Sequence, residues 1–266
     1  MRHRAKRSLG QNFLVDPNLQ HKIVDAVGAG GDDEVLEIGP GKGALTRHMV
    51  DRVGRLVLVE LDDRLAEHLA ARYGQRGDVE VIHGDVLEVD LPSHLREPAE
   101  TLVVGNIPYN ITTPIIFKLL ERPRPASIVL MVQDEVADRV VAPVGSKAYG
   151  SLSVGVRSVA KAERLFKVGR GAFRPVPGVD SAVIRITPFR PERIDLDEET
   201  ALRRLVRAAF QWRRKQLRKI LRDHPDLGIG QEGIKDALEA AGVQPTDRPE
   251  RVDPEGFVAM ARSLYQ

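Results

Sequence analysis

The chain has 266 residues, of which 42% are hydrophobic, with 40 Lys and Arg against 38 Asp and Glu, as expected for a soluble globular protein with one large domain and a smaller one. It contains no cysteine, which excludes disulfides, thiolate metal sites and cysteine nucleophiles and is compatible with a reducing cytoplasm. The basic N-terminus is followed by no apolar stretch, so we expect a cytoplasmic protein with neither a signal peptide nor a membrane span.

The first half of the sequence alternates between short apolar runs and segments of helical periodicity. The runs are rich in Val, Ile and Leu, as in buried parallel strands, and cover residues 35–38, 56–60, 79–82, 102–104 and 128–132. Helical periodicity covers residues 43–50, 63–72 and 114–120, the last with Thr113 as candidate N-cap and Pro114 at the first helical position. This alternation predicts an α/β fold with a doubly wound parallel sheet.

The second half predicts the edge of that sheet and then a helical domain. Residues 152–159 and 181–187 are strand-like and suit an antiparallel pair that closes the sheet edge. Prolines at 188 and 191 then interrupt the pattern, and the rest is helical in period, over residues 198–222, 233–241 and 254–265. We therefore predict one domain over residues 1–187 and a small all-helical domain over residues 188–266.

A glycine-rich turn follows the first predicted strand, where residues 37–44 read EIGPGKGA. Glu60 ends the second strand and can accept both hydroxyls of a ribose, while Asp85 follows the third and can accept from an adenine amino group. The turn alone leaves open a nicotinamide or flavin cofactor, S-adenosylmethionine, or simple packing of strand on helix. A P-loop is disfavoured because Gly43, and not Ser or Thr, follows Lys42.

The peptide Asn106-Ile107-Pro108-Tyr109 follows the fourth strand, at the same edge of the sheet. The Asn106 side-chain carbonyl and the Ile107 backbone carbonyl can accept from an exocyclic amine, and Tyr109 can stack on the base. Since asparagine is no general base, positioning and charge stabilisation would carry the rate, which suits the activated methyl donor S-adenosylmethionine. On its own the peptide is also compatible with an ordinary turn after a strand.

Six stretches in family order resemble the bacterial small-subunit (16S) ribosomal RNA adenine N6,N6-dimethyltransferases. They are residues 8–14 (SLGQNFL), 37–43 (EIGPGKG), 105–111 (GNIPYNI), 146–153 (SKAYGSLS), 173–181 (FRPVPGVDS) and 210–219 (FQWRRKQLRK). The resemblance implies a class I, Rossmann-like methyltransferase sheet with a small helical C-terminal domain. It also implies that S-adenosylmethionine is the cofactor, and that the substrate is two adjacent adenosines near the 3′ end of 16S rRNA in an immature small subunit.

The resemblance further implies a role for individual residues. The cofactor would be covered by Asn12 and Leu14, and would be bound by Gly39 at its methionine end, by Glu60 at its ribose, by Asp85 at its adenine and by Asn106. Asn106 would also hold the target amine, and Phe173 would stack on the target base opposite Tyr109. Gly178 departs from the family, which commonly has a basic residue there, and this puts one RNA contact in doubt.

Nine basic residues and no acidic one lie between positions 203 and 222. On a helix the apolar positions of this stretch face inward and the cations outward, which suits an RNA backbone, although a solvated helix face is the alternative. The N-terminus adds a second basic group, made of Arg2, Arg4, Lys6 and Arg7.

Several alternatives stay open from sequence. They are a large-subunit (23S) rRNA adenine methyltransferase that confers macrolide resistance, a mainly non-catalytic ribosome assembly factor and, less favoured, a DNA adenine methyltransferase. The seven histidines form no metal-binding motif, so no metal is expected. A monomer is the simplest expectation.

Overall fold

The computed structural model describes residues 11–265, which fall into two compact units. The first contains residues up to 137 together with 163–188, and the second contains residues 138–162 together with the chain from 189 onward. The last segment of the second unit begins at residue 189, one residue after the predicted start of the helical domain at 188. Residues 138–162, however, belong to the second unit, whereas the prediction assigned them to the first domain. Within residues 11–265, no helix is long and apolar enough to cross a membrane.

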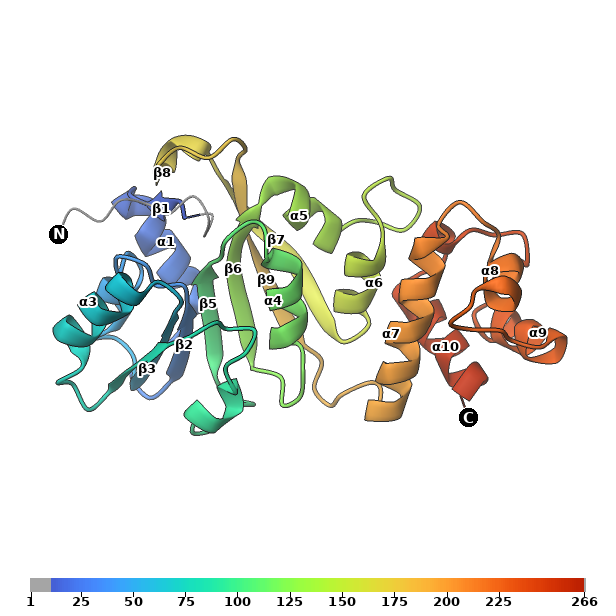
Figure 1. The fold of residues 1–266 in the computed structure, drawn as a ribbon, viewed down its shortest axis with the longest axis horizontal. Coiled ribbons are helices and arrows are strands. Elements are labelled where there is room, and N and C mark those ends of the chain that lie inside the picture. The colour runs from blue at the N-terminus through green and yellow to red at the C-terminus, as the bar shows by residue number, and fades with distance from the viewer. Residues whose placement is uncertain (1–10, 266) are drawn as a thin grey trace. The chain divides into compact units, whose positions relative to one another are not determined.

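The first unit is built around a seven-stranded sheet with the order β4-β3-β2-β5-β6-β9-β7 (Figure 1). Its strands are β2 (Glu34–Ile38), β3 (Arg55–Glu60), β4 (Val79–His83), β5 (Leu102–Asn106), β6 (Ser127–Gln133), β7 (Ala160–Val168) and β9 (Ser181–Pro188). The first five run parallel, and β9 is antiparallel to β6. The Val, Ile and Leu side chains of β2, β3, β5 and β6 are largely buried because both faces of the sheet are covered. The predicted α/β fold class is confirmed.

Helices connect the strands of the first unit. They are α1 (Pro17–Val27), α2 (Thr46–Met49), α3 (Asp63–Tyr73), α4 (Thr112–Leu119) and α5 (Asp134–Val140), which runs on into the second unit, and 3-10 turns occur at Leu91–His94 and Arg170–Ala172. The predicted helix over residues 43–50 is shorter than expected because its first residues form the glycine turn. The prediction of Thr113 as N-cap is wrong: α4 begins at Thr112, so Pro114 is its third residue, where a missing N–H still removes no helical hydrogen bond.

The prediction of a strand over residues 152–159 is wrong, because these residues form helix α6 (Ser151–Arg157). The Gly150 N–H donates to the Ser153 hydroxyl (3.1 Å), which in turn donates to the Arg139 carbonyl, so the first turn of the helix is fixed locally. A short apolar run that is buried on most sides has no periodicity to separate strand from helix. The edge strand is instead β7, which follows directly.

The C-terminal part of the second unit is helical, as predicted. It contains α7 (Leu196–Gln211), α8 (Leu217–Asp223), α9 (Gln231–Ala240), a 3-10 turn (Pro249–Arg251) and α10 (Pro254–Tyr265). The single helix predicted over residues 198–222 is broken between Trp212 and Gln216. The break allows the backbone N–H groups of Leu217 and Arg218 to bond the carbonyls of Asp247 and Pro245.

Two very short strands, β1 (Phe13–Leu14) and β8 (Phe173–Arg174), pair antiparallel outside the main sheet (Figure 1). Phe13 lies opposite Arg174, and Leu14 lies opposite Phe173. The N–H of Val15 adds a hydrogen bond to the Ala172 carbonyl (2.8 Å). The N-terminal segment is thus attached to a part of the chain about 160 residues further on.

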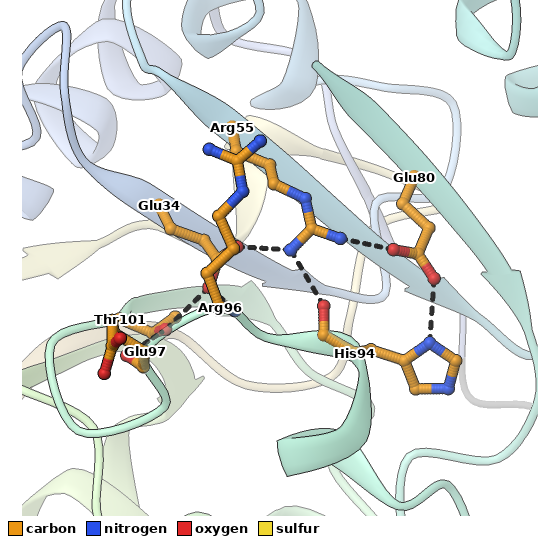
Figure 2. Close-up of polar contacts among 7 residues, drawn as sticks. All are labelled: Glu34, Arg55, Glu80, His94, Arg96, Glu97 and Thr101. Atoms are coloured by element: carbon orange, nitrogen blue, oxygen red, sulfur yellow. Dashed lines mark hydrogen bonds and ion pairs between the residues drawn. The ribbon is translucent and has the colours of Figure 1, made fainter. Parts of the chain in front are cut away.

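A charge cluster centred on Arg55 ties together the amino ends of β2, β3 and β4 (Figure 2). The guanidinium bridges the carboxylates of Glu34 and Glu80 and donates to the His94 carbonyl (2.8 Å). Glu80 is also bonded by the His94 ring (2.8 Å), and Glu34 accepts from the Thr101 hydroxyl (3.0 Å). These contacts stabilise the sheet at the edge opposite the carboxyl ends of the parallel strands.

Candidate active site

A cavity of about 500 Å³ lies at the carboxyl ends of β2, β3 and β5, within the first unit. In a parallel sheet this edge is where ligands bind, and the volume is typical of a small-molecule pocket. All of the predicted site residues except Phe173 line it: Asn12, Leu14, Gly39, Glu60, Asp85, Asn106 and Tyr109.

The glycine turn forms one wall of the cavity. Gly39 and Gly41 have φ angles of 64° and 60°, in the left-handed region that favours glycine. A Cβ at Gly41 would lie 3.3 Å from the ring of Phe13, which also lines the cavity. The glycines of EIGPGKGA therefore leave this wall without a side chain at positions 39 and 41.

Glu60 ends β3 and is buried against the glycine turn. Its Oε2 accepts from the Gly41 N–H (2.8 Å) and its Oε1 from the Asp62 N–H (2.9 Å). Burial raises the pKa of Glu60, and the two backbone N–H groups oppose that shift. Because each carboxylate oxygen has two lone pairs, the group can still accept hydrogen bonds from a ligand.

Glu37 also lines the cavity, although no role for it was predicted from the sequence. Its side chain is only 2% exposed, and its Oε2 accepts from the Thr46 hydroxyl (2.7 Å). Burial, together with nearby Glu60, raises the pKa of Glu37 to about 8. Two carboxyl groups that resist ionisation therefore share one pocket.

The peptide after β5 lines the cavity beside the glycine turn, and a Cβ at Gly39 would lie 3.6 Å from the Asn106 carbonyl oxygen. The Asn106 Nδ2 group donates to the Asn12 carbonyl (3.1 Å), which fixes the orientation of the amide. Tyr109 is half-buried, and its hydroxyl lies 2.7 Å from the Oγ of Ser181. Burial raises the pKa of Tyr109 above its ordinary value of 10, so the phenol keeps its proton at neutral pH.

The segment around Asn12 covers part of the cavity. Gln11 donates to Asp62 (3.3 Å), and the Lys42 ammonium lies 4.5 Å from the centre of the Phe13 ring. The Leu14 carbonyl accepts from the side chain of Gln20 (3.0 Å), a buried residue that also lines the cavity. These contacts place Asn12 and Leu14 at the pocket, whereas residues 2–7 lie outside the described part of the chain.

Asp85 follows β4 and reaches the cavity from a tight turn. Its Oδ1 accepts from the Leu87 N–H (2.9 Å), so one side of the carboxylate holds the turn. Gly84 precedes it and donates its N–H to the Glu60 carbonyl (3.0 Å). Asp85 and Glu60 therefore line the same end of the pocket.

The structure does not bring Phe173 to the cavity, contrary to the prediction that it stacks on the target base. Its side chain is fully buried in the core cluster that also contains Leu14, its partner across the β1–β8 pair. Successive residues of a strand point to opposite sides, so the neighbouring Arg174 lines the cavity instead. Phe173 acts here as a core residue.

Two further contributors, Ser181 and Gln20, were not predicted from the sequence. Ser181 was quoted within the FRPVPGVDS stretch without a role, and it bonds Tyr109 from 72 residues away. Gln20 belongs to α1, for which no element was predicted. Neither residue type carries a signal of its own, because serine and glutamine are common in every kind of structure.

The basic stretch lies mainly on exposed positions of α7, α8 and the loop between them. Arg203 pairs with Glu199 (2.6 Å) and Arg222 with Asp223 (2.7 Å), so acids just outside the stretch bind its two ends. Arg213 donates to the Ser146 carbonyl (3.3 Å). The other basic side chains of the stretch are exposed: Arg204, Arg207, Arg214, Lys215, Arg218 and Lys219. Its apolar positions are buried, with Phe210 partly so.

Within residues 11–265, no group of three or more His, Asp or Glu side chains is arranged to hold a metal ion.

The chain matches the family model of ribosomal RNA adenine dimethylases over residues 2–264. It is 43% identical to ribosomal RNA small subunit methyltransferase A of Geobacillus thermodenitrificans, over 97% of this chain and 90% of the relative. The protein of the same name from Pseudomonas aeruginosa is 41% identical, over 99% and 96%.

Solved structures give the same result. A dimethyladenosine transferase from Plasmodium falciparum superposes with a TM-score of 0.77 at 26% identity, over 93% of this chain and 95% of that one. The 23S rRNA methyltransferase ErmE gives 0.72 at 29% identity, over 96% and 100%. The predicted fold and family are confirmed: the chain belongs to the ribosomal RNA adenine dimethylase family.

Proposed function

We propose that this chain uses S-adenosylmethionine to place two methyl groups on N6 of each of two adjacent adenosines near the 3′ end of 16S rRNA, in an immature small subunit. One observation carries the proposal. The cavity is lined by the carboxylates of Glu60 and Asp85, which would suit a nucleoside, and also by Asn106 and Tyr109, which would suit an adenine amino group. Cofactor and target base would therefore meet in one pocket.

The residues of the pocket fit a cationic nucleoside cofactor. Glu37 and Glu60 both have raised pKa values because they are buried together, and a positively charged ligand would let both ionise. Glu60 would accept the ribose hydroxyls, Asp85 the adenine amino group, and the open wall at Gly39 would admit the methionine end. When bound, the sulfonium supplies an activated methyl group.

Asn106 would hold the target amine. Because its Nδ2 already donates to the Asn12 carbonyl, its Oδ1 is left as the acceptor for an N–H of adenine. A second acceptor, the Ile107 carbonyl, would bind the other N–H. Two acceptors favour a more tetrahedral nitrogen, with its lone pair directed away from both.

Tyr109 would provide the surface on which the flipped base stacks. Its phenol stays protonated at neutral pH because burial raises its pKa, and an asparagine amide takes up no proton there. Neither group is a general base, so the rate would depend on positioning, and the amine proton would leave to solvent during or after transfer. A base outside a continuous duplex stack is easier to flip, which favours a loop or junction.

The second unit would supply RNA contacts through its exposed basic side chains. Phosphates are the natural complement of this surface, and each cation that contacts one releases a counterion. We assign the methyl-transfer role to the first predicted domain and RNA binding to the helical one. A cytoplasmic monomer remains our expectation.

The small-subunit substrate is favoured over 23S rRNA by the difference in identity. Relatives named as small-subunit methyltransferases are 39–43% identical to this chain, against 29% for the 23S enzyme ErmE. Purified protein should dimethylate immature small subunits from cells that lack the modification, with dimethyladenosine detected by mass spectrometry. Activity only on naked large-subunit RNA would contradict the proposal.

An Asn106→Ala variant separates catalysis from a role in assembly. We expect methyl transfer to fall by at least about 100-fold, because the amine loses one of its two acceptors, while affinity for the subunit stays unchanged. If cells with this variant assemble and grow normally although their rRNA is unmethylated, recognition of the subunit is the main task and methylation is secondary.

A further inference from the structure

Ser181 makes a side-chain contact that links the strand β9 to the active-site loop. It is the first residue of β9, is fully buried, and pairs with Gln133 at the end of β6. Its Oγ lies 2.7 Å from the hydroxyl of Tyr109. Ser181 does not itself line the cavity, whereas Tyr109 does.

The position of Ser181 is rigid because three contacts hold the preceding residue, Asp180. The Asp180 carbonyl accepts from the Asp134 N–H (3.1 Å). The Asp180 carboxylate pairs with Lys167 (2.9 Å) and accepts from the Arg170 N–H (3.0 Å). Groups that are held on strands in this way are placed more precisely than groups on loops.

The hydrogen bond between Ser181 and Tyr109 restricts the direction of the long axis of the Tyr109 ring, on which an adenine would stack. A phenol oxygen lies on the long axis of the ring, so a fixed oxygen fixes the direction of that axis. Rotation about the axis remains. Without the bond, rotation about the χ1 torsion could move the ring by more than a fraction of an ångström, which is the displacement that aligned transfer tolerates.

We propose that Ser181 is a positioning residue for methyl transfer: its hydroxyl holds Tyr109 so that a stacked adenine presents its amino group to Asn106. This inference rests on the function proposed above. Misalignment affects the transition state more than binding, so loss of the bond should lower kcat by about 10- to 100-fold. KM for RNA and the Kd of the cofactor should stay nearly constant.

The test compares four variants on immature small subunits: Ser181→Ala, Tyr109→Phe, the double variant and a control, Ser158→Ala. Ser158 is also buried, and its hydroxyl bonds the Val154 carbonyl (2.8 Å) in the other unit. Single-turnover rates, KM and calorimetric cofactor affinity are measured for each. Both single variants should lose kcat by a similar factor, the double variant should be no slower than the slower single one, and the control should match the wild type.

The outcomes are distinct. A wild-type protein that does not methylate small subunits overturns the proposed function itself. The positioning role is overturned, and the proposed function is left intact, by either of two results. One is a double variant in which the activation free-energy losses of the two single variants add. The other is a Ser181→Ala protein with a lower melting temperature but full kcat per folded molecule. If Ser181→Ala does not fold, Tyr109→Phe removes the same bond without altering β9, and full activity in that variant overturns the inference.

Discussion

Replacing Glu37 by Gln should remove a large pH dependence from the stability of the fold. Glu37 is almost completely buried, and its pKa is raised from 4.5 to about 8. At pH 7 the carboxyl therefore keeps its proton in the folded chain and loses it in the unfolded chain. Since the folded state binds more protons, stability is lost as the pH rises from about 4.5 to about 8.

The size of the effect follows from the width of that window. Each pH unit within it costs about 1.4 kcal/mol, so this group alone makes the fold about 3 kcal/mol less stable at pH 7 than at pH 5. Glutamine has nearly the shape of the protonated acid, and its Oε1 can still accept from Thr46. The two proteins should be about equally stable at pH 5, and the Glu37→Gln variant should be about 3 kcal/mol more stable at pH 7.

Urea unfolding of both proteins at pH 5, 6, 7 and 8 measures this difference, and the other titrating groups largely cancel in it. Thr46→Val offers a second check. It removes a hydroxyl that lowers the pKa of Glu37, so the upper end of the window should move to higher pH. A stability difference between wild type and Glu37→Gln that is the same at pH 5 and pH 8 would refute the reasoning.

Further predictions concern the sheet, the core, the glycine turn and the RNA surface. Arg55→Met removes the cation that bridges the Glu34 and Glu80 carboxylates and should lower the free energy of unfolding by about 3 kcal/mol. Cofactor affinity should not change, because the cluster lies at the opposite edge of the sheet; urea unfolding and calorimetry measure the two. Phe173→Ala should cost about 3–5 kcal/mol in urea unfolding, as expected for a cavity in the core. Gly41→Ala forces a Cβ into a left-handed backbone 3.3 Å from the ring of Phe13, so titration calorimetry should show cofactor binding weakened by about tenfold, equivalent to 1.4 kcal/mol. Reversing the charge of Arg218 and Lys219 to Glu should weaken subunit binding and reduce the slope of log K against log salt by about 2 if both contact phosphates.

The strands of the sheet were predictable because they are buried on both faces. Five runs of Val, Ile and Leu matched β2 to β6 to within two residues at each end. The same reasoning failed at residues 152–159, where the apolar residues are equally buried but the backbone is helical. Composition identifies burial, and only periodicity separates strand from helix. The first turn of the helix is held by hydrogen bonds that join Gly150 to Ser153 and Ser153 to Arg139.

The break in the helix predicted over residues 198–222 could not be predicted from the periodicity of the sequence. Residues 198–222 keep an apolar stripe throughout, yet the helix stops at Gln211 and restarts at Leu217. The N–H groups of the new helix bond carbonyls near residue 246. A contact between segments that far apart leaves no trace in local periodicity.

The site residues also fall into two groups: those that the order of the strands places, and those that contacts between distant segments place. Glu60, Asp85 and Asn106 lie at or just after the carboxyl ends of parallel strands, and topology alone brings such positions to one edge of a sheet, so their meeting in one cavity followed from the order of the elements. The stretch from Phe173 to Ser181 has no such constraint, and its side chains depend on pairings with Leu14 and Tyr109 that only the folded chain forms. Phe173 belongs to the core, whereas Ser181 holds the loop after β5 through its hydrogen bond to Tyr109. The contact of this stretch with Tyr109 therefore comes from the serine, whose hydroxyl can bond a phenol, and not from the aromatic residue.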